Sequence, residues 1–147
     1  MKKLLFAVAA TLALAAGCSG QAKKKDCFKE PNFAYDIYTQ NNYEWFAGKL
    51  PDDTKITWVR NLHDDETGEK YQADTSCDKI GGGLHCQIRL DKDANSSSLI
   101  TVMAIFHEQC HIKTWEETKR TDADPHGPLF QGCMKDLAAR GAFAEYW

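Results

Sequence analysis

The chain has 147 residues, of which 43% are hydrophobic, and its formal net charge at pH 7 is −3. A chain of this length supports one domain with a modest core. Because basic residues are not in excess, the composition argues against a nucleic-acid-binding surface, and we expect no nucleic acid among the partners.

The N-terminus has the pattern of an export signal. Met1-Lys2-Lys3 is a short positive start, and the apolar run from Leu4 to Ala16 is shorter than a transmembrane helix requires. The small residues before Cys18 resemble the lipobox of bacterial lipoproteins, in which this cysteine is lipidated, although Ala15 stands where leucine is commoner. We expect a signal peptide over residues 1–17 and a lipid anchor on Cys18, with an ordinary cleaved signal as the alternative.

The segment after the signal predicts a tethered envelope domain. Residues 18–30 are polar for most of their length and are typical of a tether, so the folded domain is expected over residues 31–147. This places the domain in the cell envelope, lipid-anchored to the periplasmic or extracellular face of a bacterial membrane. Removal of residues 1–17 takes away two lysines and no acidic residue, which leaves a net charge of about −5.

An oxidising compartment allows the mature cysteines to pair. Cys77 and Cys86 flank three glycines and suit a bridge across a hairpin. Our second expected pair is Cys27 with Cys133, which would join the N-terminal segment to the C-terminal helix. With Cys110 the number of these cysteines is odd, so at least one stays free, and the sequence does not fix the connectivity.

The first half of the domain predicts one helix and three strands. Apolar residues at helical spacings predict a helix over residues 31–47, ending before a glycine. Alternating apolar residues predict a strand over residues 55–59, a weak second strand over 70–73 and a third over 85–90. We expect a mainly antiparallel, meander-like sheet.

The second half predicts two helices. The first begins after one of three serines at 96–98 and runs to about Glu117, and its turns from Leu99 to Phe106 are apolar on nearly every face, which is typical of a buried helix. A break at residues 121–125 precedes a last helix over about 126–140. The fold class predicted is therefore α+β, as a single domain.

The buried helix carries the sequence HEQCH at its centre. Residues four apart on a helix point the same way, so His107 and His111 can bind one zinc ion. Glu108 can accept a proton from a zinc-bound water, whose pKa the ion lowers to about 7. This is the HExxH arrangement of zincins. The alternative is a solvated helix end with two surface histidines, which would need no buried helix.

A catalytic zinc ion needs a third protein ligand and one open position. The metzincin pattern is excluded because Thr114 and Glu117 occupy its glycine and histidine positions. We favour His126, since Asp124-Pro125 turns the chain out of the helix and Gly127 permits close backbone approach. The carboxylates left open as alternatives are those of Glu116, Glu117, Asp122 and Asp124, whereas His63 and His85 are expected not to bind the ion.

HEQCHxxxW, followed by HGPLF fifteen residues after the second histidine, resembles the SprT-like zinc metalloprotease domain, the family that includes Spartan. The resemblance extends to YTQNNYEWFAGKLP at residues 38–51 and covers about residues 35–140. It implies a small zincin-like domain with one zinc ion per chain. It also implies that the zinc ligands are His107, His111 and His126 and that Glu108 is the catalytic acid and base.

The resemblance carries further expectations. Cys110 matches the family's frequent Glu-Met-Cys-His form, which implies an unpaired, buried thiol, and Phe130 and Leu137 match packing positions behind the third ligand. The chain departs from the family in two ways. It has no CxxC pair after the domain for a zinc ribbon, and its lipoprotein signal removes it from cytosolic DNA, so crosslink repair is not carried over.

The sequence thus predicts an exported, membrane-anchored zinc metallopeptidase, expected as a monomer, that hydrolyses a peptide or protein substrate. The strand at Gln87–Leu90 is expected to pair with an extended peptide. No oxyanion-stabilising residue is assigned, and Tyr146 and Arg89 are expected to be structural. The alternatives are a non-catalytic, zinc-stabilised envelope binding lipoprotein and a hydrolase of peptidoglycan peptides.

Overall fold

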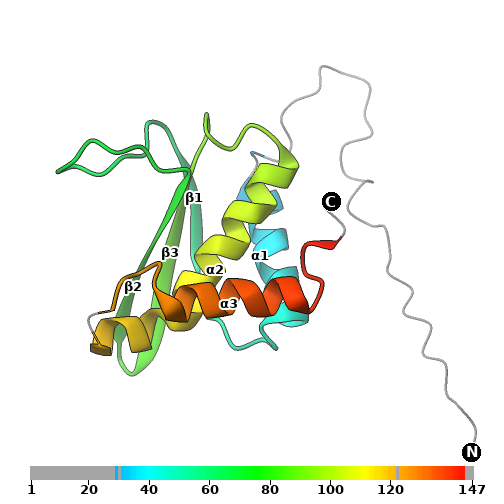
Figure 1. Ribbon diagram of the computed structural model, residues 1–147. Coiled ribbons are helices and arrows are strands. Elements are labelled where there is room, and N and C mark those ends of the chain that lie inside the picture. Colours follow the sequence, from blue (N-terminus) through cyan, green and yellow to red (C-terminus); the bar gives the residue numbers. More distant parts are fainter. Residues whose placement is uncertain (1–28, 30, 122, 145–147) are drawn as a thin grey trace, which may run out of the picture.

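The computed structural model describes residues 29, 31–121 and 123–144. In chain order the elements are α1 (Pro31–Trp45), β1 (Lys55–Val59), β2 (Ala73–Ile80), β3 (Gly83–Asp91), α2 (Ser98–Thr121) and α3 (Pro128–Ala139). Figure 1 shows the strands on one side of the molecule, with α1 and α2 against the sheet and α3 lying across α2. The α+β class predicted from the sequence is confirmed.

The sheet is mixed, with β3 between the other two strands. β3 pairs in parallel with β1 from Gln87 to Asp91 and antiparallel with β2 from Gly83 to Leu90. The expected meander is therefore wrong, because the segment 60–72 carries the chain past β3 before β2 begins. The second strand lies at 73–80 in place of the predicted 70–73. The prediction was wrong because only one residue of this strand is buried, so its sequence lacks a clear apolar alternation.

The long helix α2 is buried, as its apolar sequence predicts. Thr101, Ile105 and Cys110 are fully buried, and Ile88 and Leu90 of β3 belong to the same core. The Ser97 hydroxyl accepts a hydrogen bond from the backbone N–H three residues later, so the helix begins at one of the three predicted serines. Burial of this helix keeps its backbone rigid where the HEQCH residues lie.

A buried polar network joins α1 to α2. The Gln109 side chain accepts a hydrogen bond from Asn41 Nδ2 at 3.0 Å and donates one to the carbonyl of Tyr38 at 2.9 Å. On the next residue of α1, the Asn42 side chain accepts from the N–H of Leu50 and donates to its carbonyl, both at 3.0 Å. The asparagine pair of the 38–51 segment therefore fixes α1 against α2 and against the loop that leads to β1.

Two disulfides lie within the described residues. Cys77 and Cys86 are opposite each other on β2 and β3 and form the predicted bridge. The predicted Cys27–Cys133 pair and the free Cys110 thiol are wrong, because Cys133 is bonded to Cys110. The packing of α3 on α2 brings these two Cα atoms to 5.8 Å, a proximity that sequence spacing does not reveal. The first bridge closes a chain segment of 9 residues and the second a segment of 23, so each stabilises the fold by about 3 kcal/mol.

The two disulfides indicate an oxidising, extracytoplasmic location. No helix in the described part of the chain is both long enough and apolar enough to cross a membrane. The predicted signal peptide, Cys18, most of the tether and Cys27 lie outside the described residues, so the lipid anchor stays a prediction.

Asp91 closes the end of β3 and is buried. Its carboxylate accepts hydrogen bonds from the backbone N–H groups of Leu62 at 2.8 Å, Asp93 at 2.8 Å and Ala94 at 2.9 Å. Burial, the largest single influence, raises the pKa of Asp91, but the three donors together lower it below its ordinary value. The ionised side chain therefore fixes both the turn after β3 and the segment before β2.

Replacement of this carboxylate should destabilise the domain. We expect Asp91→Ala to lower the free energy of unfolding at pH 7 by about 2–4 kcal/mol, because three backbone N–H groups lose their partner. Urea denaturation measures the change, and exposed Asp93→Ala in the same turn is the control, expected within about 0.5 kcal/mol of the parent. Because the folded-state pKa is lowered, the difference should be present above about pH 4 and shrink as the pH falls further. Equal losses in both variants would contradict the assignment.

Candidate metal centre

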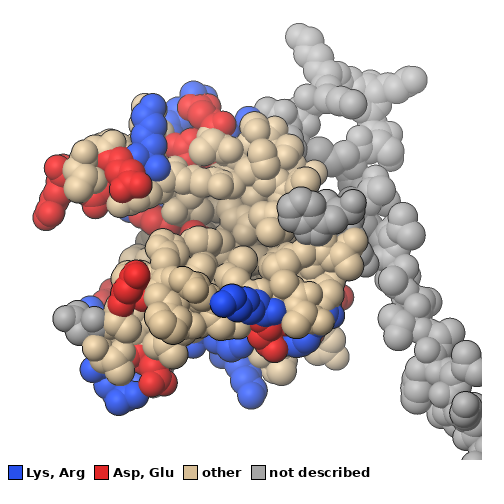
Figure 2. Space-filling model, in the orientation of Figure 1, with Lys and Arg blue, Asp and Glu red and all other residues tan. Residues whose placement is uncertain are grey.

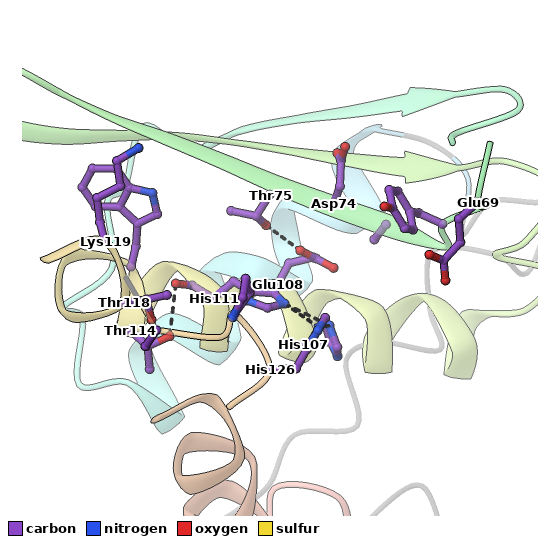
Figure 3. Close-up of a pocket in the computed structure, with 15 residues that line it drawn as sticks. Glu69, Asp74, Thr75, His107, Glu108, His111, Thr114, Thr118, Lys119 and His126 are labelled. Carbon is purple, nitrogen blue, oxygen red and sulfur yellow. Dashed lines mark hydrogen bonds between the residues drawn. The ribbon is translucent and has the colours of Figure 1, made fainter. Parts of the chain in front are cut away.

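Three imidazoles converge at the surface of α2. His107 and His111 lie one turn apart on this helix, and His126 comes from the loop that precedes α3. Their Nε2 atoms are 3.1 Å apart in each of the three pairs. Figure 3 shows the three rings pointing toward one another. The structure thus brings together the three histidines that the sequence singled out, as a group that could hold a metal ion.

Hydrogen bonding among these nitrogens does not explain the arrangement. In a neutral imidazole Nε2 either carries a proton or presents a lone pair, so at least one of the three pairs would match two donors or two acceptors. A cation among them satisfies three lone pairs at once. Two nitrogens bound to a tetrahedral zinc ion lie about 3.3 Å apart, close to the separation of 3.1 Å found here. The residues therefore fit a zinc site with three protein ligands.

The protonation of the histidines suits a metal. Burial, the larger cause, and the neighbouring His126 together lower the pKa of His107 to about 4. Burial and the other two imidazoles likewise lower the pKa of His111 to about 4. Both rings are therefore neutral at pH 7, which is the form that binds metal ions.

A tight turn sets the position of His126. Its backbone N–H donates to Asp124 Oδ1 at 2.9 Å, and the N–H of Gly127 donates to the Asp124 carbonyl at 2.8 Å. A Cβ atom on Gly127 would lie 2.9 Å from that carbonyl oxygen, so the predicted close approach at this glycine is confirmed. The helix α3 then begins at Pro128, and Pro at the first helical position suits the start of a helix.

The ring of Phe130 supports all three imidazoles. Its centroid is 4.6 Å from that of His107, 4.4 Å from His111 and 4.9 Å from His126. Phe130 and Leu137 are both buried, so the packing roles implied by the family resemblance are confirmed. A flat apolar side chain behind the ligands excludes water from that side of the site.

The alternative ligands have other partners. Glu116 pairs with Lys79 at 3.1 Å and Glu117 with Arg120 at 2.8 Å, while Asp124 caps the turn described above. Asp122 lies outside the described residues. His63 and His85 are not part of the three-histidine group, as expected, and the ring of His85 contacts Asp53 instead. Among the described candidates only His126 reaches the helical pair.

Glu108 lies beside the histidines and is buried. Its Oε2 accepts a hydrogen bond of 2.6 Å from the hydroxyl of Thr75 on β2, and Figure 3 shows the carboxylate turned toward this strand. Burial raises the pKa of Glu108 to about 7; the Thr75 hydrogen bond opposes this shift, and Asp74 adds to it. A carboxyl group with a pKa near neutrality is suited to proton transfer. Sequence reasoning missed Thr75, because a threonine in a polar strand gives no distinctive signal.

The histidines line a cleft of about 790 Å³ between α2 and the edge of the sheet. Ala73, Asp74 and Thr75 of β2 form one wall, and Figure 3 shows Glu69 and Lys119 toward opposite ends with the histidines between them. Trp115, the tryptophan of the HEQCHxxxW motif, also lines the cleft, as does Tyr71, which was not singled out from the sequence. In Figure 2 acidic side chains lie above and below a hollow on the left of the molecule, together with basic ones.

The strand expected to pair with a substrate is not the one at the cleft. Gln87–Leu90 belongs to β3, whose two edges are already paired with β1 and β2, so that expectation is wrong. The expectation that Arg89 is structural agrees with its hydrogen bonds to the carboxylate of Asp74, and Tyr146 lies outside the described residues. The edge strand β2 is the one that borders the cleft.

No protein-family model matches this chain, and no curated protein matches it. Three histidines around one buried helix in a small α+β domain are nevertheless consistent with a zincin-like site.

The three-histidine group should bind one divalent zinc ion per chain. We expect His126→Ala to weaken zinc binding by at least about 100-fold, beyond the 10–100-fold typical of losing an outer-shell partner. The matched control is His85→Ala, which removes an imidazole from the surface without touching the group and should leave the affinity unchanged. Competition with a chelator of known affinity measures both. Unaltered affinity in His126→Ala would show that the third ligand is another residue.

Proposed function

We propose that the protein is an exported zinc metallopeptidase similar to the SprT-like domain, with His107, His111 and His126 as ligands and Glu108 as general base and acid. The observation that supports this most directly is the convergence of three Nε2 atoms at 3.1 Å beside a buried carboxyl group. A zinc ion, when bound there, supplies polarisation of a substrate carbonyl and a lowered pKa for the attacking water.

The protein's own groups account for the proton transfers. Glu108 takes one proton from the attacking water and gives it to the leaving amine nitrogen, so that the peptide bond is replaced by a carboxylic acid and an amine. The water's second proton then passes from the new carboxyl group to the amine, which leaves a carboxylate and an ammonium group. Thr75 donates to one carboxylate oxygen of Glu108 at 2.6 Å and leaves the other available for the water. Thr75 is thus a positioning residue that acts through Glu108.

The cleft is suited to an extended peptide. β2 is an edge strand, and the residues that line the cleft include three consecutive positions of it, Ala73 to Thr75. Unpaired backbone groups on such an edge bind a peptide by adding it as a further strand. Our proposed substrate is therefore a peptide or an unfolded protein segment, bound along β2 in place of the β3 strand expected from the sequence.

The open cleft favours catalysis over a purely structural metal site. Structural zinc sites use four protein ligands and are closed, whereas catalytic sites use three and keep one position for water. Here the described residues supply three histidines at the wall of a cleft, and a general base lies next to them. We further propose that lipidated Cys18 anchors a monomeric domain at the envelope, where peptidoglycan peptides are an alternative substrate.

Removal of the general base should separate metal binding from catalysis. We expect Glu108→Gln to retain one zinc ion and to lose at least about 100-fold in the rate of peptide hydrolysis, because proton transfer is lost. The control is Glu117→Gln, an exposed glutamate on the same helix that should be fully active. Each variant is incubated with a peptide library, and with muropeptides in a parallel reaction, and mass spectrometry measures the cleavage products. Unchanged cleavage by Glu108→Gln would remove the catalytic assignment.

Loss of the Thr75 hydroxyl should lower kcat more than it changes KM for the peptide. We expect Thr75→Val to lower kcat by about 10-fold with little change in KM, because Glu108 loses the donor that orients it. Thr75→Ser keeps the hydroxyl and should restore most of kcat. Steady-state kinetics on one library-derived peptide checks this, and a serine variant as slow as the valine variant would argue against orientation by the hydroxyl.

A further inference from the structure

We infer that the Cys110–Cys133 disulfide positions the third metal ligand, so that the oxidised chain binds metal much more tightly than the dithiol chain. This inference rests on the metal site of the proposed function and does not depend on whether that site cleaves peptides. Cys110 and Cys133 are positioning residues, since neither belongs to the group of potential ligands.

The bridge begins inside the metal motif. Cys110 directly precedes His111 on α2, and its side chain is fully buried and is not among the residues that line the cleft. Its sulfur is bonded to Cys133 in the middle of α3, which is also buried. The disulfide therefore fixes α3 to the very turn of α2 that carries the helical ligand pair.

One face of α3 joins this bridge to the imidazoles. Phe130, Cys133 and Leu137 are spaced three and four residues apart, so they lie on the same side of the helix, and all three are buried. Phe130 lies one turn before the disulfide, with its ring 4.4 Å from that of His111 and 4.9 Å from that of His126. A bridge at Cys133 limits both the sliding and the rotation of this face on α2.

The backbone of His126 is hydrogen-bonded to the first turn of α3. Its carbonyl accepts a hydrogen bond from the Gln131 side chain at 3.1 Å, and the Gly127 carbonyl accepts one from the Gln131 backbone at 3.0 Å. The turn that holds His126 thus moves with the first turn of α3. Metal–ligand distances tolerate deviations of only about 0.2 Å, so small shifts of α3 on α2 are enough to weaken binding.

The second disulfide offers a matched comparison. Cys77 and Cys86 join two strands that are already paired over eight positions, from Ala73–Leu90 to Ile80–Gly83, and neither strand carries a histidine of the metal group. Loss of this bridge removes a covalent constraint of the same kind and leaves the relation between α2 and α3 unchanged. It therefore controls for general destabilisation.

The redox step has a simple balance. A small dithiol reduces the bridge by giving two electrons and two protons, which yields the Cys110 and Cys133 thiols and the cyclic disulfide of the reductant. Because both sulfurs are buried, the state of the pair is set when the chain folds and changes slowly afterwards. Metal binding is thereby coupled to folding in an oxidising compartment, and a chain still in a reducing compartment binds the ion weakly.

The test is a chelator competition titration of zinc on the full chain. We expect Cys110→Ala/Cys133→Ala to bind zinc at least about 10-fold more weakly than the parent, and Cys77→Ala/Cys86→Ala to stay within about threefold. Circular dichroism verifies folding, and Cys133→Ala alone, which leaves Cys110 as a small buried thiol, repeats the test with fewer atoms removed. Equal affinities in the parent and the Cys110/Cys133 variants overturn the inference.

A double-mutant cycle with His126→Ala identifies the route of the effect. If the disulfide acts by positioning His126, its removal in the His126→Ala background changes the zinc affinity by less than about twofold. A full 10-fold loss in that background would mean that the bridge only stabilises the domain, and would overturn the inference. A parent protein without zinc affinity would instead refute the proposed function, so the two failures are distinct.

Discussion

The burial of one turn of α2 is the constraint on which the site depends. This turn contacts β2, α1 and α3, each through a different side chain of HEQCH. Glu108 accepts a hydrogen bond from β2, Gln109 binds α1, and Cys110 is bonded to α3, while His107 and His111 converge with His126 at the cleft. Since a helix turns through 100° per residue, five consecutive residues face all of these directions. The motif is therefore a structural junction as well as a candidate metal site.

The chemical character of the site follows from this burial. Removal of water keeps two of the imidazoles neutral and raises the pKa of Glu108 to about 7, so metal ligands and a proton acceptor coexist at pH 7. Cys110 is a case in which the family resemblance misled: a buried cysteine in this motif implied a free thiol, yet the packing of α3 places a second cysteine within bonding distance. In an oxidising compartment that proximity becomes a covalent bond.

Local patterns predicted the elements with strong periodicity and failed where periodicity is weak. The strand at 55–59 and the buried helix with its serine start are as predicted, because alternation and an apolar run of full helical length are visible in the sequence. The predicted position of β2 is wrong because the exposed face of this strand is polar. The mixed strand order does not follow from the sequence, because the segment 60–72 has no pattern that shows on which side of β3 the next strand will lie.

The sequence by itself determined the α+β class and the histidine pair on one helix face, since both follow from the periodicity and spacing of residues along the chain. It favoured His126 and the Cys77–Cys86 bridge without fixing either. Only the tertiary structure decided that Thr75 binds Glu108, that β2 borders the cleft and that Cys110 pairs with Cys133. These contacts join residues 23 to 33 positions apart, and their geometry depends on how helices and sheet pack together. The spacing of residues along one helix or strand fixes which side chains point the same way, whereas the packing of the elements fixes which side chains come into contact.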